Sequence, residues 1–171
     1  MKLLYVEDDE DLRDLFTDCL KEEFEEVVTC EDGSSAFDVF ESQRFDLVVS
    51  DFKMPKRNGL DLFRDIRETG SDIPFVFLTG YSGELYSVAK GSLDFYVLDK
   101  PIQFEFLNKI LSEIMELDCQ RRDLEYELFY RAKNTENFED WIEFAQQKRR
   151  LLFMKRLKIS NDKLIFRQKA G

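Results

Sequence analysis

The sequence predicts an α/β fold: a doubly wound, five-stranded parallel sheet with helices on both faces. Three observations support this prediction. Five short apolar runs alternate with stretches in which apolar residues recur every three or four positions. The runs are almost continuously hydrophobic, which is typical of parallel strands buried on both faces. Acidic, hydroxyl and lysine side chains follow four of the runs, where open α/β sheets bind their ligands.

The elements can be assigned in order along the chain. Strands are expected at residues 3–6, 27–30, 45–50, 73–78 and 95–98. Helices are expected at 12–20, from about 34 to 40, at 59–68, near 83–90 and after residue 101. Five such units fit the flavodoxin-like sheet with strand order 2-1-3-4-5, in which the first and third strands lie side by side.

On that strand order, the residues that follow the first and third strands become neighbours. Glu7 and Asp8 follow the first strand, and Asp51 follows the third. Clustered carboxylates repel one another unless a cation lies among them, and oxygen ligands favour Mg²⁺. Asp51 could then act as a nucleophile toward a phosphoryl group, with Thr79 and Lys100 stabilising the charge on its oxygens.

Four segments in order carry a family resemblance: Val-Glu-Asp-Asp at 6–9, Asp-Phe-Lys-Met-Pro at 51–55, Phe-Leu-Thr-Gly at 77–80 and Lys-Pro at 100–101. Through these segments, residues 1 to about 117 resemble the receiver domain of two-component response regulators. The resemblance implies that Asp51 accepts phosphate from a sensor histidine kinase or a phosphotransfer protein.

The resemblance also implies roles for the other site residues. The expected Mg²⁺ ligands are Asp8, Glu7, Asp51 and the backbone carbonyl of Lys53. The groups expected around the phosphoryl group are Thr79, Lys100 and Gly80, whose small size leaves the site accessible. Pro101 is expected to follow a cis peptide bond. Lys53 and Tyr81 occupy positions that tune the lifetime of the phosphate in this family.

One position departs from the family pattern. Receiver domains usually carry Tyr or Phe three residues before the lysine, as a switch residue that follows the movement of the threonine. Here that position is Val97, and Tyr96 lies one residue earlier. Since neighbouring strand residues face opposite sides, either the strand is bulged or the switch aromatic is missing. We favour Tyr96 in this role.

Composition excludes several other classes of protein. Histidine is absent and the three cysteines lack metal-like spacing, which argues against a zinc site, a disulfide framework or a histidine phosphoacceptor. The sequence has no apolar run of membrane-spanning length, so a cytoplasmic protein without membrane contact is expected. An aspartyl-nucleophile phosphatase would share the chemistry of Asp51, but Lys53 stands where such enzymes carry a second acid. We therefore expect a non-enzyme.

Residues 118–171 are expected to form a mainly helical extension of the 1–117 domain. Residues 1–118 hold 12 Lys and Arg against 28 Asp and Glu, whereas residues 119–171 hold 13 against 8. Such a charge difference suggests separate roles for the two segments. The last helix of the domain is expected to continue to about residue 130. A second helix is expected at about 137–158 and a short tail at 159–171.

A heptad seam runs along the long helix, through Leu107, Ile110, Ile114, Leu117, Arg121, Leu124 and Leu128. Two interpretations stay open for it. The seam could form a parallel coiled-coil homodimer, or the next helix of the same chain could cover it.

The C-terminal residues 148–169 contain nine Lys or Arg and one Asp. This basic segment could bind DNA, but it is short for a winged or tri-helical DNA-binding domain. We favour a role in complementing the acidic domain. The expected protein is a response regulator that signals through protein contacts or dimerisation. The alternatives are a transcriptional regulator with a DNA-binding tail and a receiver-like domain that has lost phosphorylation.

Overall fold

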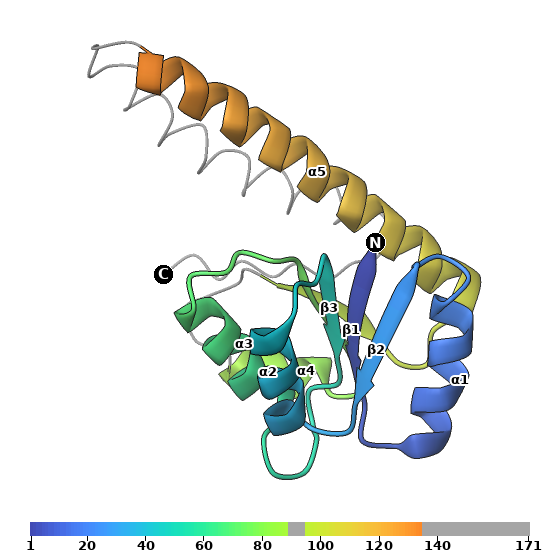
Figure 1. Ribbon diagram of the computed structural model, residues 1–171. Coiled ribbons are helices and arrows are strands. Elements are labelled where there is room, and N and C mark those ends of the chain that lie inside the picture. The colour runs from blue at the N-terminus through green and yellow to red at the C-terminus, as the bar shows by residue number, and fades with distance from the viewer. Residues whose placement is uncertain (89–94, 135–171) are drawn as a thin grey trace. The chain divides into compact units, whose positions relative to one another are not determined.

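The computed structural model describes the backbone of residues 1–88 and 95–134, and the side chains of the same ranges up to residue 126. The chain divides into two compact units, residues 1–111 and 112–171, and the division falls inside the last described helix. The first unit contains the whole sheet (Figure 1). No helix within the described ranges is long and apolar enough to cross a membrane.

The sheet has five parallel strands in the order β2-β1-β3-β4-β5, which confirms the predicted topology. The strands are β1 (Lys2–Val6), β2 (Glu26–Cys30), β3 (Leu47–Ser50), β4 (Phe75–Thr79) and β5 (Tyr96–Asp99). The register pairs Val6 of β1 with Ser50 of β3, so both strands end at the same level. The residues that follow them, Glu7 and Asp51, are therefore brought to one edge of the sheet.

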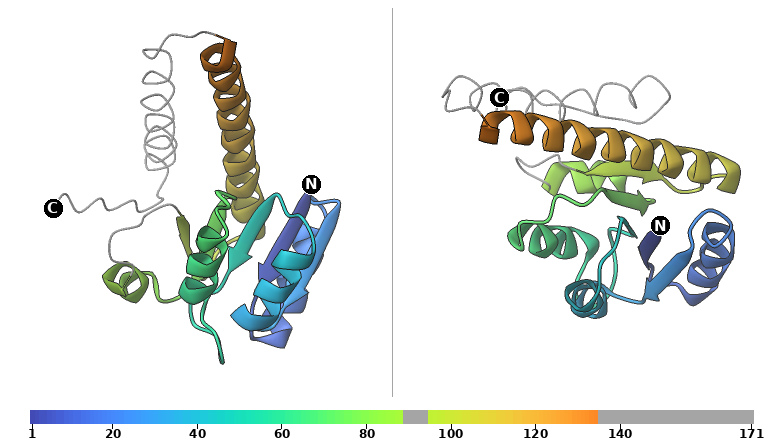
Figure 2. Two further views of the ribbon diagram at one scale, coloured as in Figure 1. Left: turned by 60° about the vertical axis from the view of Figure 1, so that its left-hand side comes forward. Right: turned by 45° about the horizontal axis from the view of Figure 1, so that its top comes forward.

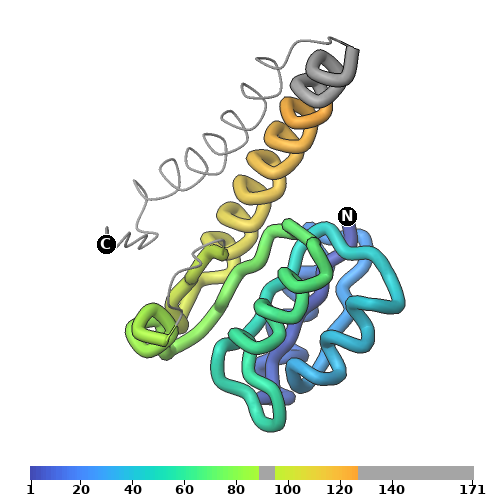
Figure 3. Tube along the Cα trace, turned by 90° about the vertical axis from the view of Figure 1, so that its left-hand side faces the viewer, coloured from blue at the N-terminus to red at the C-terminus, as the bar shows by residue number. Residues whose placement is uncertain are grey.

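Helices follow the strands in alternation along the chain, as the Cα trace shows (Figure 3). They are α1 (Glu10–Leu20), α2 (Gly33–Ser42), α3 (Gly59–Glu68), α4 (Ser82–Val88) and α5 (Phe104–Asn134). The first three begin at side chains that accept hydrogen bonds from free N–H groups: Asp9, Asp32 and Asn58. These caps fix where each strand-to-helix loop ends, and the loops carry the residues of the site.

Helices cover both faces of the sheet (Figure 2), and apolar side chains pack on each face. On one face, the ring of Phe95 is contacted edge-on by two other rings. Phe63 of α3 lies at a centroid distance of 5.2 Å from it, and Phe77 of β4 lies at 5.0 Å. The buried Leu85 of α4 belongs to this cluster. On the other face, Tyr5 of β1 contacts Phe16 of α1, whose ring meets Phe104 of α5 at 4.9 Å. Burial on both faces explains the continuously apolar strands.

Helix α5 continues to Asn134, a few residues beyond the predicted end near residue 130. The second helix expected at about 137–158 and the tail at 159–171 lie outside the described residues.

Only some of the residues in the seam predicted along α5 are buried in the structure. Leu107, Ile110 and Ile114 are buried as expected. At the next turns the structure buries Asp118 and Arg121, whereas Leu117 and Leu124 are half-buried. Arg121 is a predicted member of the seam, so the departure lies at Leu117, where the neighbouring Asp118 is buried instead and pairs with the guanidinium of Arg121.

Arg121 lies in a charged layer of α5. Its Nε and Nη2 donate to Oδ1 of Asp118 at 3.2 and 2.9 Å, and its Nη1 donates to Oε1 of Glu125 at 2.9 Å. Arg121 and Asp118 are 4% and 1% exposed in a single chain. The helix that could cover this turn lies outside the described residues, so the intramolecular seam and the homodimer both stay predictions.

Candidate functional site: an acidic cluster at the strand ends

Backbone hydrogen bonds extend the parallel ladder by one residue beyond the strands. The N–H of Asp51 donates to the carbonyl of Val6 at 2.9 Å, and the N–H of Lys100 donates to the carbonyl of Thr79 at 3.0 Å. These bonds hold Asp51 and Lys100 in strand geometry at the edge where the loops begin. The sheet itself therefore positions these two residues, and side chains placed by strands are held more precisely than side chains placed by loops.

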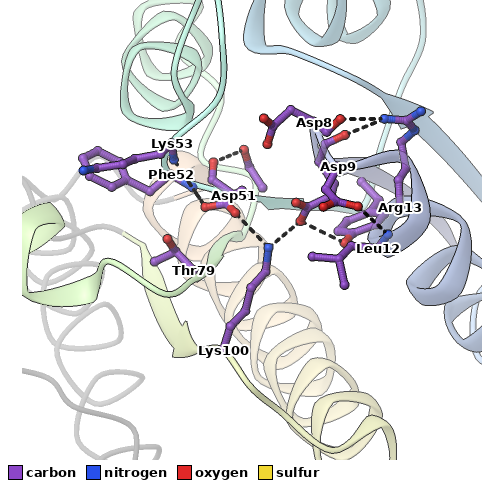
Figure 4. A network of polar contacts seen from close by, with 12 residues as sticks. Asp8, Asp9, Leu12, Arg13, Asp51, Phe52, Lys53, Thr79 and Lys100 are labelled. Atoms are coloured by element: carbon purple, nitrogen blue, oxygen red, sulfur yellow. Dashed lines mark hydrogen bonds and ion pairs between the residues drawn. The ribbon is translucent and has the colours of Figure 1, made fainter.

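Asp51 is held by donors on both carboxylate oxygens (Figure 4). Its Oδ1 accepts the N–H groups of Phe52 and Lys53, at 2.5 and 3.3 Å. Its Oδ2 accepts a hydrogen bond from Nζ of Lys100 at 2.8 Å. These donors hold the carboxylate of Asp51 in one orientation, as a nucleophile requires.

Glu7, Asp8 and Asp51 form one acidic cluster, in which a carboxylate oxygen from each lies within 4.8 Å of the others. Glu7 and Asp51 are buried, whereas Asp8 is exposed. Three oxygen ligands with one side open to water fit Mg²⁺, which retains several waters when it binds proteins. The sequence prediction that these three carboxylates meet is thus supported by their geometry.

Lys100 supplies the positive charge within this cluster. Its Nζ lies 2.6 Å from Oε2 of Glu7 and 2.8 Å from Oδ2 of Asp51. Burial alone would lower the pKa of Lys100, but its hydrogen bonds to the two carboxylates outweigh burial and raise the pKa. Burial raises the pKa of Glu7, although the hydrogen bond from Lys100 opposes this effect. Lys100 is therefore a fixed cation at neutral pH.

Thr79 ends β4 as a fully buried hydroxyl, and its Oγ1 accepts a hydrogen bond from the N–H of Tyr81 at 3.2 Å. The Lys100–Pro101 peptide bond is cis, the geometry that the resemblance implied for Pro101. At Gly80 a Cβ atom would meet nothing within 4 Å, so the space beside Thr79 is open. At Gly59, by contrast, a Cβ atom would overlap the backbone carbonyl oxygen of Asp51.

The structure separates Tyr96 from Val97 by the face of the sheet they occupy. Strand β5 pairs regularly with β4, with Val97 opposite Phe77 and no bulge. Val97 belongs to the same core cluster as Phe77, and Thr79 shares this face because it lies two residues after Phe77. Tyr96 faces the opposite side. This placement disfavours the role we preferred for Tyr96 and leaves an aliphatic residue, Val97, at the position of the switch aromatic.

Sequence reasoning gave no structural role to Arg13. Its Nη1 donates to the backbone carbonyl of Glu7 at 2.8 Å and approaches that of Asp8 at 3.5 Å. The guanidinium of α1 therefore ties down the acidic turn from which α1 begins. The sequence signal for this role was a basic residue near the start of a helix that follows an acidic loop. Many residues at such positions only contact solvent, so the signal is weak.

Tyr5 was assigned only to the apolar run of β1. The structure places its hydroxyl group 3.3 Å from Oε2 of Glu7. Burial, followed by the nearby charge of Glu7, raises the pKa of Tyr5 well above its usual range, so the phenol is a hydrogen-bond donor.

Lys53 and Tyr81 were placed beside the phosphate site by resemblance, and the structure brings them together. Nζ of Lys53 lies 4.1 Å from the centroid of the Tyr81 ring, and it also pairs with Glu84 of α4 at 2.6 Å. Glu84 was not among the predicted site residues. The three side chains link the loop after Asp51 to the start of α4.

Comparison with known proteins identifies the family. Residues 3–112 match the family model described as the response regulator receiver domain. The chain therefore belongs to the response regulator receiver family, which confirms the resemblance seen in the sequence. Membership implies phosphorylation of an aspartate by a histidine kinase or phosphotransfer protein, at a site where these domains bind Mg²⁺.

Three similar proteins illustrate the relationship. The response regulator receiver protein CpdR of Brucella abortus is 28% identical over 117 residues, which cover 68% of this chain and 95% of CpdR. The transcriptional regulatory protein GlrR of Escherichia coli is 30% identical over 122 residues, 71% of this chain but 28% of GlrR. The solved response regulator TrrA of Thermotoga maritima, in complex with Mg²⁺ and BeF, is 30% identical with a TM-score of 0.59, covering 66% of this chain and 96% of TrrA.

The similarity is confined to the receiver portion. The chain spans 28% of the length of GlrR and 47% of that of the mycobacterial response regulator MprA. What such longer relatives do beyond their receiver domains therefore does not transfer directly to this chain.

Proposed function

We propose that this protein is a phosphorylation switch in which Asp51 is the phosphoacceptor. The observation that carries the proposal is the position of Lys100, whose ammonium group contacts both Asp51 and Glu7 inside the acidic cluster. A lysine placed there neutralises the carboxylates before phosphorylation and can pair with a phosphoryl oxygen afterwards.

The proposed transfer is a displacement at phosphorus. An oxygen of Asp51 attacks the phosphorus of a phosphohistidine, the P–N bond breaks, and its electron pair returns to the imidazole nitrogen, which takes up a proton. The product is an aspartyl phosphate. The ammonium group of Lys100 moves from Oδ2 of Asp51 to a phosphoryl oxygen. The buried hydroxyl group of Thr79 turns away from the N–H of Tyr81 and donates a hydrogen bond to the phosphoryl group.

Mg²⁺ fits this site and would neutralise negative charge on the transferring oxygens. We propose that its ligands are Glu7, Asp8, Asp51 and the backbone carbonyl of Lys53. Arg13 holds the turn that carries Glu7 and Asp8, and the N–H group of Lys53 in the loop after β3 donates to Asp51. Both loops are therefore ordered around the site.

The test is incubation with acetyl phosphate, with and without Mg²⁺, followed by intact mass spectrometry. We expect one phosphoryl adduct that requires Mg²⁺ and is absent from Asp51→Asn. An adduct of equal yield in Asp51→Asn would overturn the assignment of Asp51. Asp38→Asn, which removes an exposed acid from α2, is the matched control and should be phosphorylated like the parent protein.

We propose that the output is a change in protein contacts rather than catalysis on another substrate. Sedimentation before and after phosphorylation tests for dimerisation through α5; unchanged mass in solution would favour binding to a different protein. DNA binding by the basic residues 148–169 is the second candidate. Binding to duplex DNA that weakens steeply with salt would support it, and unchanged mobility of the DNA at low salt would exclude it.

A further inference from the structure

Tyr5 and Glu7 lie two residues apart on β1 and its extension, so their side chains leave the same face of the sheet. Tyr5 is fully buried, and its hydroxyl group donates to Oε2 of Glu7 at 3.3 Å. We propose that Tyr5 is a positioning residue for the metal site, and that its hydroxyl group holds the Glu7 carboxylate in the orientation that binds Mg²⁺. The inference rests on the proposed function of this site and assigns it one more residue.

Packing alone does not require a tyrosine at this position. The ring of Tyr5 contacts Phe16 at a centroid distance of 6.1 Å, and phenylalanine would fill the same space. A buried hydroxyl group is costly unless it is hydrogen-bonded, and the partner that this one has is a carboxylate of the acidic cluster. The polar atom of Tyr5 thus serves the site rather than the core.

The distribution of donors on Glu7 leaves one oxygen for the metal. Lys100 and Tyr5 both donate to Oε2, at 2.6 and 3.3 Å. Within the described part of the chain, no hydrogen bond falls on Oε1. With Oε2 occupied by two donors, Oε1 is the oxygen available to the cation or to one of its waters.

The contribution of Tyr5 becomes larger when Lys100 leaves Glu7. In the proposed reaction, Lys100 turns toward the phosphoryl group on Asp51. Arg13 still holds the backbone of Glu7, but it does not contact the carboxylate. Tyr5 is then the side-chain donor that remains on Oε2 and keeps the carboxylate from rotating away from the cation.

The test compares Tyr5→Phe with the parent protein by titration with Mg²⁺ alone in a calorimeter. We expect the dissociation constant for Mg²⁺ to rise about tenfold, as is typical when a group that orients a metal ligand is removed. The rate of phosphorylation by acetyl phosphate should recover at saturating Mg²⁺. Tyr86→Phe, which removes the hydroxyl group of a half-buried tyrosine on α4, is the matched control and should leave the dissociation constant unchanged.

A double-mutant cycle separates positioning from a purely structural role. In a Glu7→Gln background, Tyr5→Phe should cause little further loss of Mg²⁺ affinity, because the carboxylate that it positions is gone. Equal losses in both backgrounds, or a Tyr5→Phe dissociation constant within twofold of the parent value, would overturn the inference about Tyr5. Failure of the parent protein itself to bind Mg²⁺ or to form the adduct would instead overturn the proposed function.

Discussion

The Nζ atom of Lys100 lies 2.6 Å from Oε2 of Glu7, although the two residues are 93 positions apart in the chain. This contact joins the fifth strand to the first and places a cation among acids that would otherwise repel one another. A metal ion bound by Glu7 and Asp51 would therefore compete with Lys100 for the same carboxylates. This competition predicts how replacing Lys100 changes the affinity for Mg²⁺.

Lys100→Met should separate metal binding from phosphoryl transfer. Without the ammonium group, the cluster is more negative, and we expect the affinity for Mg²⁺ to rise at least about fivefold. The rate of phosphorylation at saturating Mg²⁺ should fall about 100-fold, because one group that stabilises the transferring oxygens is lost. Calorimetry and intact mass spectrometry measure the two effects. Lys109→Met, at an exposed position of α5, should change neither.

Gly59 and Gly80 should respond differently to the same added methyl group. Gly59→Ala places a Cβ atom against the backbone of Asp51, and we expect a loss of about 3 kcal/mol in the free energy of unfolding or a displaced Asp51. Gly80→Ala meets open space and should be nearly neutral in stability. Urea unfolding of both variants measures this difference, and equal stabilities would show that the loop yields easily at Gly59.

The charge of Asp32 should make stability depend on pH in acid. The hydrogen bond from Lys56 and those from the N-terminus of α2 lower the pKa of Asp32 to about 2, below its ordinary value of 3.8. Because the folded-state pKa is depressed, this stabilisation is present above pH 4 and is lost as pH falls toward 2. We expect it to amount to about 1 kcal/mol, since Lys56 is largely exposed.

Asp32→Asn provides the comparison, because asparagine can still cap α2 but carries no charge. The difference in unfolding free energy between the parent protein and this variant should shrink between pH 5 and pH 2.5 in urea titrations. A difference that stays constant over this range would mean that the ion pair with Lys56 does not stabilise the fold.

Tyr81 is expected to limit the access of water to the aspartyl phosphate. Its ring is half-exposed and lies under the ammonium group of Lys53, between the loop after Asp51 and α4. Tyr81→Ala should shorten the half-life of the phosphate a few-fold, because water reaches the phosphorus more easily. Tyr126→Ala on α5 removes another exposed ring and should leave the half-life unchanged. A longer half-life in Tyr81→Ala would show that the ring instead assists hydrolysis.

Much of the fold and the position of the site follow from the sequence. The strand order and the convergence of Glu7, Asp8 and Asp51 were predicted from the apolar runs and from the residues that follow them. Both features can be recognised directly in the sequence. Some boundaries nevertheless differ from the predicted ones. Strand β3 begins at Leu47 rather than at residue 45, and β4 begins at Phe75 rather than at residue 73, since Pro74 has no N–H to donate.

The supporting contacts could not be predicted in the same way. The hydrogen bond from Tyr5 to Glu7 needs the face of the strand and the rotamer of the ring, and an apolar run does not mark a tyrosine as functional. Whether Tyr96 or Val97 shares the sheet face of Thr79 depended on one residue of register in β5, which the sequence does not determine. In α5, the heptad pattern correctly included Arg121 but pointed to Leu117, whereas Asp118, which pairs with Arg121, is the more deeply buried residue at that turn.

The central claim is that Asp51 carries the phosphoryl group, and chemical trapping tests it most directly. After phosphorylation by acetyl phosphate with Mg²⁺, borohydride reduces an aspartyl phosphate to homoserine, which peptide mass spectrometry locates in the chain. We predict homoserine at position 51 and its absence when Mg²⁺ is omitted. Homoserine at position 8 or 9, or none despite a phosphoryl adduct, would contradict the account.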